Sequence, residues 1–161
     1  MARRAVYTGS FDPISLGHLN VIERSSRLVD ELIVGVGHNI DKQSLFTAEE
    51  RVDLIKLATQ HLANVEVKMF SGLAVRFVRE CGSRVIVRGV RSLGDIESEF
   101  TMTLANRQLD SDIETVFLMA DDQFSHVSSS LIKQIASLAG DEELARFVPS
   151  VIIPHLRAKI G

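Results

Sequence analysis

The sequence has few of the residues that would cross-link the chain or place it in a membrane. It contains one cysteine, three prolines and no tryptophan among its 161 residues. The lone thiol, Cys81, cannot form a disulfide within the chain and cannot supply a structural zinc site. No apolar run approaches the roughly 18 residues of a transmembrane helix, and the N-terminal residues lack the apolar segment of a signal peptide. These absences predict a cytoplasmic protein without a membrane partner.

The chain also has no block of like charges. Its formal net charge is −3, and 24% of its residues are charged. It therefore lacks the basic arm that is typical of many nucleic-acid-binding proteins, and we expect no nucleic-acid partner. With 45% hydrophobic residues the chain can bury one core of ordinary size, so residues 1–161 are predicted to form a single domain.

Short apolar runs alternate with amphipathic segments. Strands are predicted at 3–8, 31–37, 64–70, 84–88 and 113–119, and helices at 16–28, 48–61, 73–81, 95–109 and 127–138. The tail is expected to form two short helical pieces, because Gly140 and Pro149 interrupt it. This alternation predicts an α/β fold with a doubly wound, five-stranded parallel sheet.

The polar loops that could carry chemistry all follow predicted strands. They lie at 9–18, 38–46, 71–74, 89–91 and 120–130. In open parallel sheets, ligands bind beyond the carboxyl ends of the strands, at the point where the strand order reverses. The sequence therefore predicts one active site, built from these loops.

The loop at 9–18 is the strongest candidate for holding an anion. Gly9, Asp12-Pro13 and Gly17 turn the chain sharply between a strand and a helix, and His18 lies in the first turn of that helix. Free amides and the helix dipole favour a phosphate at such a position. A surface or capping role is the alternative for His18, since position alone does not decide between them.

Basic and hydroxyl residues in the later loops have two interpretations each. Arg88 and Arg91 suit phosphate recognition because a guanidinium matches phosphate oxygens, or they form ion pairs with nearby acidic residues. The serines at 128–130 either cap a helix or offer donors to an anion. Lys42 and Glu99, taken alone, fit a solvated surface. The candidate acidic partners of Arg88 are Asp95, Glu97 and Glu99.

Other nucleotide and metal motifs are absent from the sequence. The segment that starts at Gly35-Val-Gly37 lacks the third glycine of a dinucleotide fingerprint and follows the second strand rather than the first. There is no Walker A sequence, and the histidines do not have metal-ligand spacing. We therefore expect no metal ligands among the protein side chains.

Two signatures together resemble a known enzyme family. The stretch from Gly9 to His18 resembles the opening of nucleotidyltransferases with an [H/T]-x-G-H signature, and residues 127–133 resemble their second signature, I-S-S-S-x-x-[R/K]. The closer resemblance is to the bacterial phosphopantetheine adenylyltransferase family, over nearly the whole chain. The segments that support it are 46–51, 87–91, 97–99 and 105–107.

The resemblance implies a Rossmann-like nucleotidyltransferase fold and a specific reaction. Members of the family reversibly transfer AMP from ATP to 4′-phosphopantetheine, which gives dephospho-CoA and pyrophosphate in coenzyme A biosynthesis. The reaction uses Mg²⁺. The family is typically a homohexamer and can be inhibited by coenzyme A, so both properties are expected here.

The resemblance also assigns roles to individual residues. His18 would stabilise the transition state, and Lys42 and Arg91 would share in catalysis. Phosphopantetheine would be bound by Ser10, Lys42, Ala74 and Arg88. ATP would be bound by Ser10, Phe11, His18, Gly89, Val90, Arg91, Glu99, Phe124, Ser125, His126, Val127, Ser128, Ser129 and Ser130. Ser98 and His126 stand where the family often has aromatic residues, which affects the packing around ATP rather than the reaction.

Two other functions fit the same residues less well. Related transferases act on nicotinate mononucleotide or glycerol 3-phosphate, some with CTP, but the set of Lys42, Ala74 and Arg88 favours the pantetheine acceptor. A non-catalytic nucleotide-binding module is the alternative from another class. His18 together with basic residues in several loops argues against it, because a binder would not need so many groups that neutralise phosphate.

Overall fold

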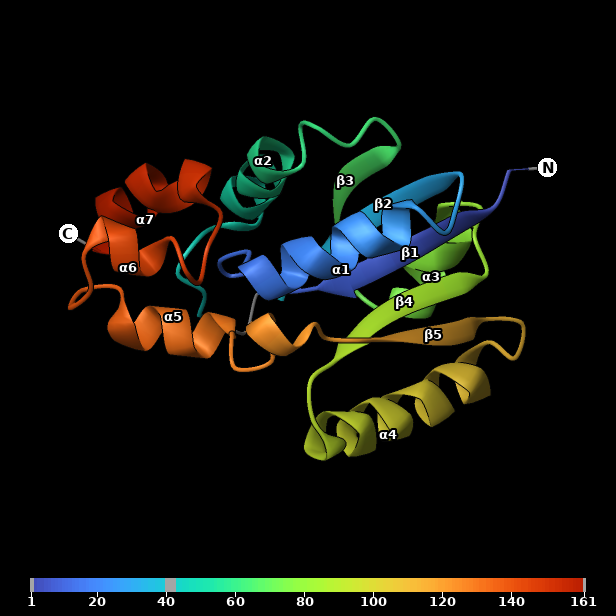
Figure 1. Cartoon of the computed structure of the whole chain (residues 1–161). Coiled ribbons are helices and arrows are strands. Elements are labelled where there is room, and N and C mark those ends of the chain that lie inside the picture. The colour runs from blue at the N-terminus through green and yellow to red at the C-terminus, as the bar shows by residue number, and fades with distance from the viewer. Residues whose placement is uncertain (1, 40–42, 161) are drawn as a thin grey trace.

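The computed structural model describes residues 2–39 and 43–160, and its centre is a five-stranded parallel sheet. The strands are β1 (Arg4–Gly9), β2 (Glu31–Gly37), β3 (Val65–Phe70), β4 (Val85–Val90) and β5 (Glu114–Met119). Their order in the sheet is β3-β2-β1-β4-β5, so the direction of winding reverses between β1 and β4. The predicted doubly wound parallel sheet is confirmed (Figure 1).

Helices cover both faces of the sheet and its carboxyl end. They are α1 (Leu16–Ser26), α2 (Ala48–Ala58), α3 (Ala74–Glu80), α4 (Leu93–Leu109), α5 (Ser129–Ile135), α6 (Asp141–Leu144) and α7 (Ile153–Ile160). Two short 3₁₀ turns, η1 (Asp122–Phe124) and η2 (Ser150–Ile152), complete the described elements. The last three helices gather at the end of the sheet where β1 runs into α1 (Figure 1).

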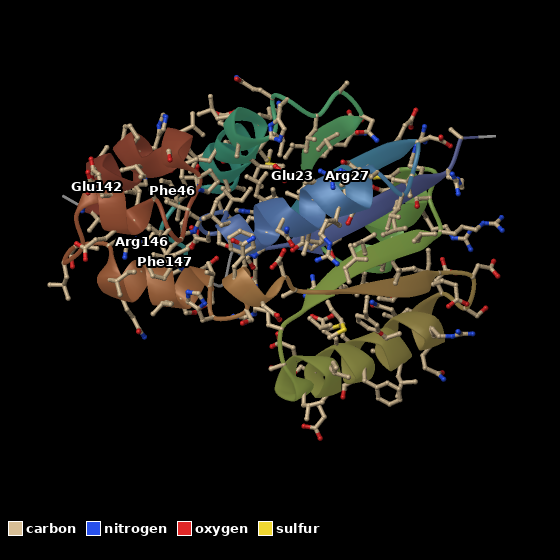
Figure 2. All side chains as sticks on the ribbon, viewed as in Figure 1. Glu23, Arg27, Phe46, Glu142, Arg146 and Phe147 are labelled. Carbon is tan, nitrogen blue, oxygen red and sulfur yellow. The ribbon has the colours of Figure 1, made fainter. Side chains whose placement is uncertain are left out.

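The core has two parts because successive residues of a strand point to opposite faces of the sheet. Tyr7 of β1 packs in the larger cluster with α1 and α2, whereas Val6 packs in the smaller cluster with α3. Cys81 also belongs to the smaller cluster, so its thiol is part of the core. Phe46 is 2% exposed and has the ammonium of Lys159 5.8 Å from its ring centre, which ties the start of α2 to α7 (Figure 2).

Several predicted boundaries are wrong by a few residues. The connection between the strand predicted at 84–88 and the helix predicted at 95–109 is reduced to two residues, because β4 continues to Val90 and α4 begins at Leu93. The Ser92 hydroxyl accepts a hydrogen bond from the amide of Asp95 and so caps α4 earlier than expected. α2 ends at Ala58, and the hydroxyl of Thr59 donates to the carbonyl of Ile55 beside that end.

The helix α4 differs from the others in its burial. None of its residues is buried, and Phe100, Met102 and Leu104 are each more than half exposed. Met119 at the end of the neighbouring β5 is also exposed. No helix in the described part of the chain is long and apolar enough to cross a membrane.

Candidate active site

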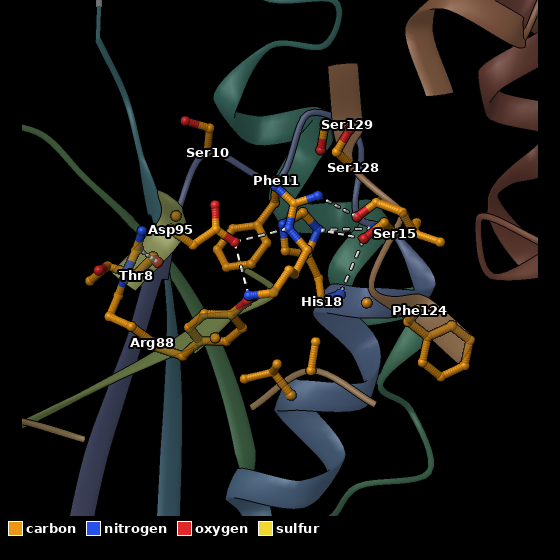
Figure 3. A pocket seen from close by; sticks show the side chains of 18 of the residues that line it. Thr8, Ser10, Phe11, Ser15, His18, Arg88, Asp95, Phe124, Ser128 and Ser129 are labelled. Atoms are coloured by element: carbon orange, nitrogen blue, oxygen red, sulfur yellow. Dashed lines mark hydrogen bonds and ion pairs between the residues drawn. The ribbon is translucent and has the colours of Figure 1, made fainter. Parts of the chain in front are cut away.

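A cavity of about 270 Å³ lies at the carboxyl ends of β1 and β4, where the winding of the sheet reverses. It is lined by Tyr7, Thr8, Gly9, Ser10, Phe11, Ser15, Gly17, His18, Val21, Arg88, Gly89, Arg91, Asp95, Glu99, Ala120, Phe124, Val127, Ser128 and Ser129. These residues come from β1 and the first loop, α1, the end of β4 and its connection to α4, the first turns of α4, and the segment before α5; Figure 3 labels ten of them. Three of the five predicted site loops therefore meet at one cavity.

The other two loops contribute less than expected. Asn39 and Ser44 border a smaller cavity of about 130 Å³, which shares Ser10 and Ser129 with the larger one. No residue of the loop at 71–74 lines either cavity. A strand order of β3-β2-β1-β4-β5 explains this, because the loop that follows β3 leaves the edge of the sheet, away from the crevice.

The first loop is shaped by close packing of its own residues. Phe11 adopts a backbone φ of 51°, a left-handed conformation that is uncommon for residues other than glycine. Its ring occupies the space over Gly9, where a Cβ atom would lie 3.0 Å from two ring carbons. Glycine at this position thus lets the aromatic ring fold back against β1.

His18 is held by the residue that caps its helix. The amide of Ser15 donates to Nδ1 of His18 at 3.0 Å, and the amide of His18 donates to the Ser15 hydroxyl at 3.1 Å. A backbone N–H can only donate, so Nδ1 carries no proton and the proton of the neutral ring resides on Nε2. The ring of Phe11 packs against the imidazole with 4.9 Å between ring centres.

The surroundings of His18 keep its imidazole neutral. Burial, followed by the positive charges of Arg88 and Arg91, lowers the pKa of His18 to about 4. At neutral pH the ring is therefore an uncharged hydrogen-bond donor that lines the cavity. The capping role that the sequence offered for His18 is confirmed, because Ser15 and His18 form a capping box. His18 also lines the cavity, and its contact with a phosphate stays a prediction.

Arg88 reaches into the cavity in a bidentate ion pair. Its Nε and Nη2 atoms donate to the two carboxylate oxygens of Glu99 at 2.9 and 2.7 Å, and Nη1 donates to the carbonyl of Thr8. Burial lowers the pKa of Arg88, but the hydrogen bonds that Arg88 donates to Glu99 and the nearby negative charges together outweigh burial and leave this pKa raised. Burial also raises the pKa of the adjacent Tyr7 to about 12, so its hydroxyl stays protonated.

Arg91 is paired with a different residue of α4. Its amide donates to a carboxylate oxygen of Asp95 at 2.9 Å, and its Nε lies 3.3 Å from the same oxygen. Nη1 donates to the carbonyl of Val127 and so links the β4–α4 connection to the segment before α5. Asp95, a candidate partner of Arg88 in the sequence, pairs with Arg91 instead. Carboxylates of one helix thus hold both arginines at the cavity.

The serines before α5 have separate tasks. The hydroxyl of Ser128 accepts a hydrogen bond from the amide of Leu131, so Ser128 is the cap that the sequence offered as one interpretation. The hydroxyl of Ser129 donates to the carbonyl of Pro13 at 2.8 Å and fastens α5 to the first loop. Ser130 is exposed and borders the smaller cavity.

Comparison with known proteins decides the family. The cytidylyltransferase-like family model matches residues 6–135. Over 158 residues the chain is 64% identical to the phosphopantetheine adenylyltransferase of Rhodopirellula baltica, with 98% of this chain and 88% of that protein covered. The chain belongs to the phosphopantetheine adenylyltransferase family. A relative of the same name from Clostridium botulinum (strain Eklund 17B) is 50% identical over 97% of this chain and 98% of the relative.

A solved structure supports the fold of this family member. The nicotinic acid mononucleotide adenylyltransferase of Plasmodium falciparum, complexed with NaAD, superposes with a TM-score of 0.73. The alignment covers 98% of this chain and 96% of the other, at 14% identity. At that identity the likeness establishes a shared nucleotidyltransferase-like fold.

Most residues that the phosphopantetheine adenylyltransferase resemblance singles out share the larger cavity. These are Ser10, Phe11, His18, Arg88, Gly89, Arg91, Glu99, Phe124, Val127, Ser128 and Ser129. Thr8 and Asp95 lie there as well, but the sequence gave them no such role. Thr8 contributes its main-chain carbonyl, which a sequence pattern cannot predict. The sequence identifies Asp95 only as an acidic residue near the two arginines.

The remaining assigned residues lie elsewhere. Val90 is a buried strand residue, Ala74 begins α3, and neither lines a cavity. Ser125 and His126 flank the larger cavity without lining it, and the ring of His126 packs edge-on against another aromatic ring. Lys42 lies outside the described residues, so its assigned role stays a prediction.

Proposed function

We propose that the chain transfers the AMP group of ATP to 4′-phosphopantetheine and so forms dephospho-CoA and pyrophosphate in coenzyme A biosynthesis. The observation that carries this proposal is the 64% identity to a phosphopantetheine adenylyltransferase across 98% of the chain. The cavity at the sheet crossover supports it, since donors from distant parts of the chain converge there.

The reaction needs placement and charge stabilisation more than proton transfer. An oxygen of the acceptor phosphate attacks the α-phosphorus of ATP, and the bond from that phosphorus to the bridging oxygen of pyrophosphate breaks. The second pKa of a phosphate monoester is near ~6, so the nucleophile is mostly ionised at neutral pH without a general base. The protein must hold two mutually repelling anions in line and stabilise the charge that develops on the reacting phosphates.

The described residues suit these two tasks. His18 would donate its Nε2 proton in a hydrogen bond to the α-phosphate, because Nδ1 is occupied by the amide of Ser15. The arginine Arg91 would bind the polyphosphate, and Arg88 with Ser10 would bind the acceptor phosphate. The N–H groups that Arg88 and Arg91 use neither for their carboxylates nor for the carbonyls of Thr8 and Val127 would serve phosphate oxygens.

Magnesium is proposed to enter with the nucleotide rather than to reside in the protein. Among the described side chains no group of three His, Cys, Asp or Glu could hold a metal ion. The two carboxylates at the cavity, Asp95 and Glu99, are engaged by arginines. The substrate is accordingly proposed to be the Mg²⁺ complex of ATP, with its phosphates as the metal ligands.

A pyrophosphate assay tests the proposed activity. The protein is mixed with ATP, Mg²⁺ and 4′-phosphopantetheine, and release of pyrophosphate with formation of dephospho-CoA is expected. CTP in place of ATP, and nicotinate mononucleotide or glycerol 3-phosphate in place of the acceptor, should give no comparable turnover. Retained ATP binding without pyrophosphate would favour the non-catalytic nucleotide-binding module.

Replacing Lys42 with alanine is expected to impair use of the acceptor. The KM for 4′-phosphopantetheine should rise roughly 10- to 100-fold, because a lost charge-assisted hydrogen bond to phosphate is worth about 1.5–3 kcal/mol. The KM for ATP should change little. Initial-rate kinetics with each substrate varied in turn measures both constants, and an unchanged acceptor KM and rate would remove Lys42 from the site.

The cytoplasmic, homohexameric and coenzyme A-inhibited state expected for the family is also proposed for this chain. The exposed apolar residues of α4, including Phe100 and Leu104, support an interface between copies. Phe100→Glu is expected to yield smaller particles in size-exclusion chromatography with light scattering, because it puts a charge into that interface. Glu97→Gln on the same helix provides a control, and a particle mass unchanged by Phe100→Glu would place the interface elsewhere.

A further inference from the structure

Two charged side chains in the described chain are almost completely buried. Asp12 and Arg51 are each 4% exposed. In the described part of the chain they do not form an ion pair with each other. Burying a charge is costly unless hydrogen bonds satisfy it, so the contacts of both groups indicate what they accomplish. Neither contact set follows from the local sequence.

Arg51 of α2 binds three main-chain carbonyl groups from three different segments. Its Nη1 atom donates to the carbonyls of Ser10 at 2.8 Å and Gly37 at 3.1 Å, and its Nε atom donates to the carbonyl of Phe46 at 3.2 Å. One guanidinium thus joins the loop at 9–18, the end of β2 and the segment that enters α2. The planar fork of arginine suits this geometry, whereas a lysine ammonium does not reproduce it.

Asp12 completes the connection from the opposite side. Its two carboxylate oxygens accept the amides of Leu45 and Phe46 at 2.8 and 2.9 Å. The ammonium of Lys133 in α5 lies 2.9 Å from the same carboxylate and balances its charge. Phe46 is therefore held at its amide by Asp12 and at its carbonyl by Arg51.

These bonds anchor both ends of one loop. Arg51 holds the carbonyl of Gly37 at the beginning of the loop between β2 and α2, and Asp12 with Arg51 holds Phe46 at its end. Lys42 lies between these two anchors in the chain. The same guanidinium holds Ser10, which lines both cavities.

We propose that Arg51 is a positioning residue for the acceptor phosphate, because it fixes Ser10 and the ends of the Lys42-bearing loop relative to each other. This inference rests on the proposed function, in which Ser10 and Lys42 bind that phosphate. Arg51 does not line the larger cavity, and it borders the smaller one beside Ser10. In this proposal its guanidinium serves the acceptor site through the main chain that it binds. A displacement of about 1 Å at a reacting group is enough to cost roughly 10²-fold in rate.

The first test compares Arg51→Lys with Lys56→Met, a change at an exposed residue of the same helix. Arg51→Lys keeps the charge but not the fork. The KM for 4′-phosphopantetheine should rise roughly 10- to 100-fold. The dissociation constant for ATP, measured by calorimetry, should stay within about twofold, as should all constants of Lys56→Met. A rise in both substrate constants, or in neither, would overturn the positioning role.

A double-mutant cycle separates positioning from general stability. If Arg51 acts through Lys42, the effect of Arg51→Lys on the acceptor KM should largely disappear in a Lys42→Ala background. Additive effects in the double variant would show that Arg51 acts independently of Lys42. If the wild-type protein releases no pyrophosphate, the proposed function is contradicted. The anchoring role of Arg51 is then tested by hydrogen exchange, which needs no activity.

Hydrogen exchange tests the anchoring without any assay of activity. In Arg51→Lys the amides of Leu45 and Phe46 should exchange at least roughly tenfold faster, while amides in the centre of the sheet keep their protection. Unchanged exchange at these two amides would overturn the inference even in an active enzyme. Uniformly faster exchange would assign Arg51 to global stability and would overturn it as well.

Discussion

Replacing His18 with alanine is expected to lower kcat by roughly 10²- to 10³-fold, the range measured when one preorganised donor is removed from a transition-state site. The KM for ATP should change by much less, since the donor matters most when charge develops on the reacting phosphate. Steady-state kinetics with 4′-phosphopantetheine and ATP measures both quantities. A variant with near-normal kcat would contradict the assignment of His18 as the transition-state stabiliser.

The size of this effect follows from how little freedom the imidazole retains. The amide of Ser15 fixes Nδ1, and the ring of Phe11 packs against the imidazole. The Nε2 proton is therefore preorganised before substrate arrives, and no reorganisation is required during the reaction. His61→Ala is a matched control, because His61 is exposed and pairs with Glu23 on the surface. It should leave kcat within about twofold of the wild type.

Acidification from pH 7 to pH 4 is expected to destabilise the wild-type fold, with His18 contributing about 3 kcal/mol of the loss. The pKa of His18 is lowered from 6.5 to about 4 in the folded chain, mainly by burial and then by Arg88 and Arg91. Below pH 6.5 the unfolded chain takes up a proton that the folded chain refuses. The contribution of His18 to the free energy of unfolding is thus complete above pH 6.5 and is lost as the pH falls towards 4.

Denaturant unfolding at several pH values measures this contribution. In His18→Gln, which cannot be protonated, the free energy of unfolding should fall about 3 kcal/mol less between pH 7 and pH 4 than in the wild type. Equal acid sensitivity of the wild type and His18→Gln would mean that folding does not lower the pKa of His18.

The strands and the location of the site follow directly from sequence patterns. Nearly continuous apolar runs such as 31–37 occur where both faces of a parallel strand are covered, and the crevice follows from the topology. The role of Arg88 was left open between a phosphate clamp and an ion pair. The structure makes it a partner of Glu99 inside the cavity, so the two alternatives are not exclusive.

The hydrogen bonds by which Arg51 and Asp12 anchor the loop between β2 and α2 could not be predicted from sequence patterns. Arg51 and Ser10 are 41 positions apart in the chain, and Asp12 and Phe46 are 34 apart. Locally, Asp12-Pro13 resembles any turn, and Arg51 follows two glutamates at the start of a polar helix. Their burial comes from tertiary packing, which hydrophobic periodicity does not record. The capping box of this region is the exception, because Thr47 followed three residues later by Glu50 is a local pattern, and the structure contains that box.

Because His18 is neutral, ionic strength affects its contact with substrate differently from the contacts of the charged arginines. Salt screens the long-range attraction between Arg88 or Arg91 and an incoming phosphate, because both arginines are charged and partly exposed. A hydrogen bond from an uncharged imidazole has no such dependence. Added salt is therefore expected to weaken the contacts of the arginines with bound phosphates more than the hydrogen bond that His18 donates.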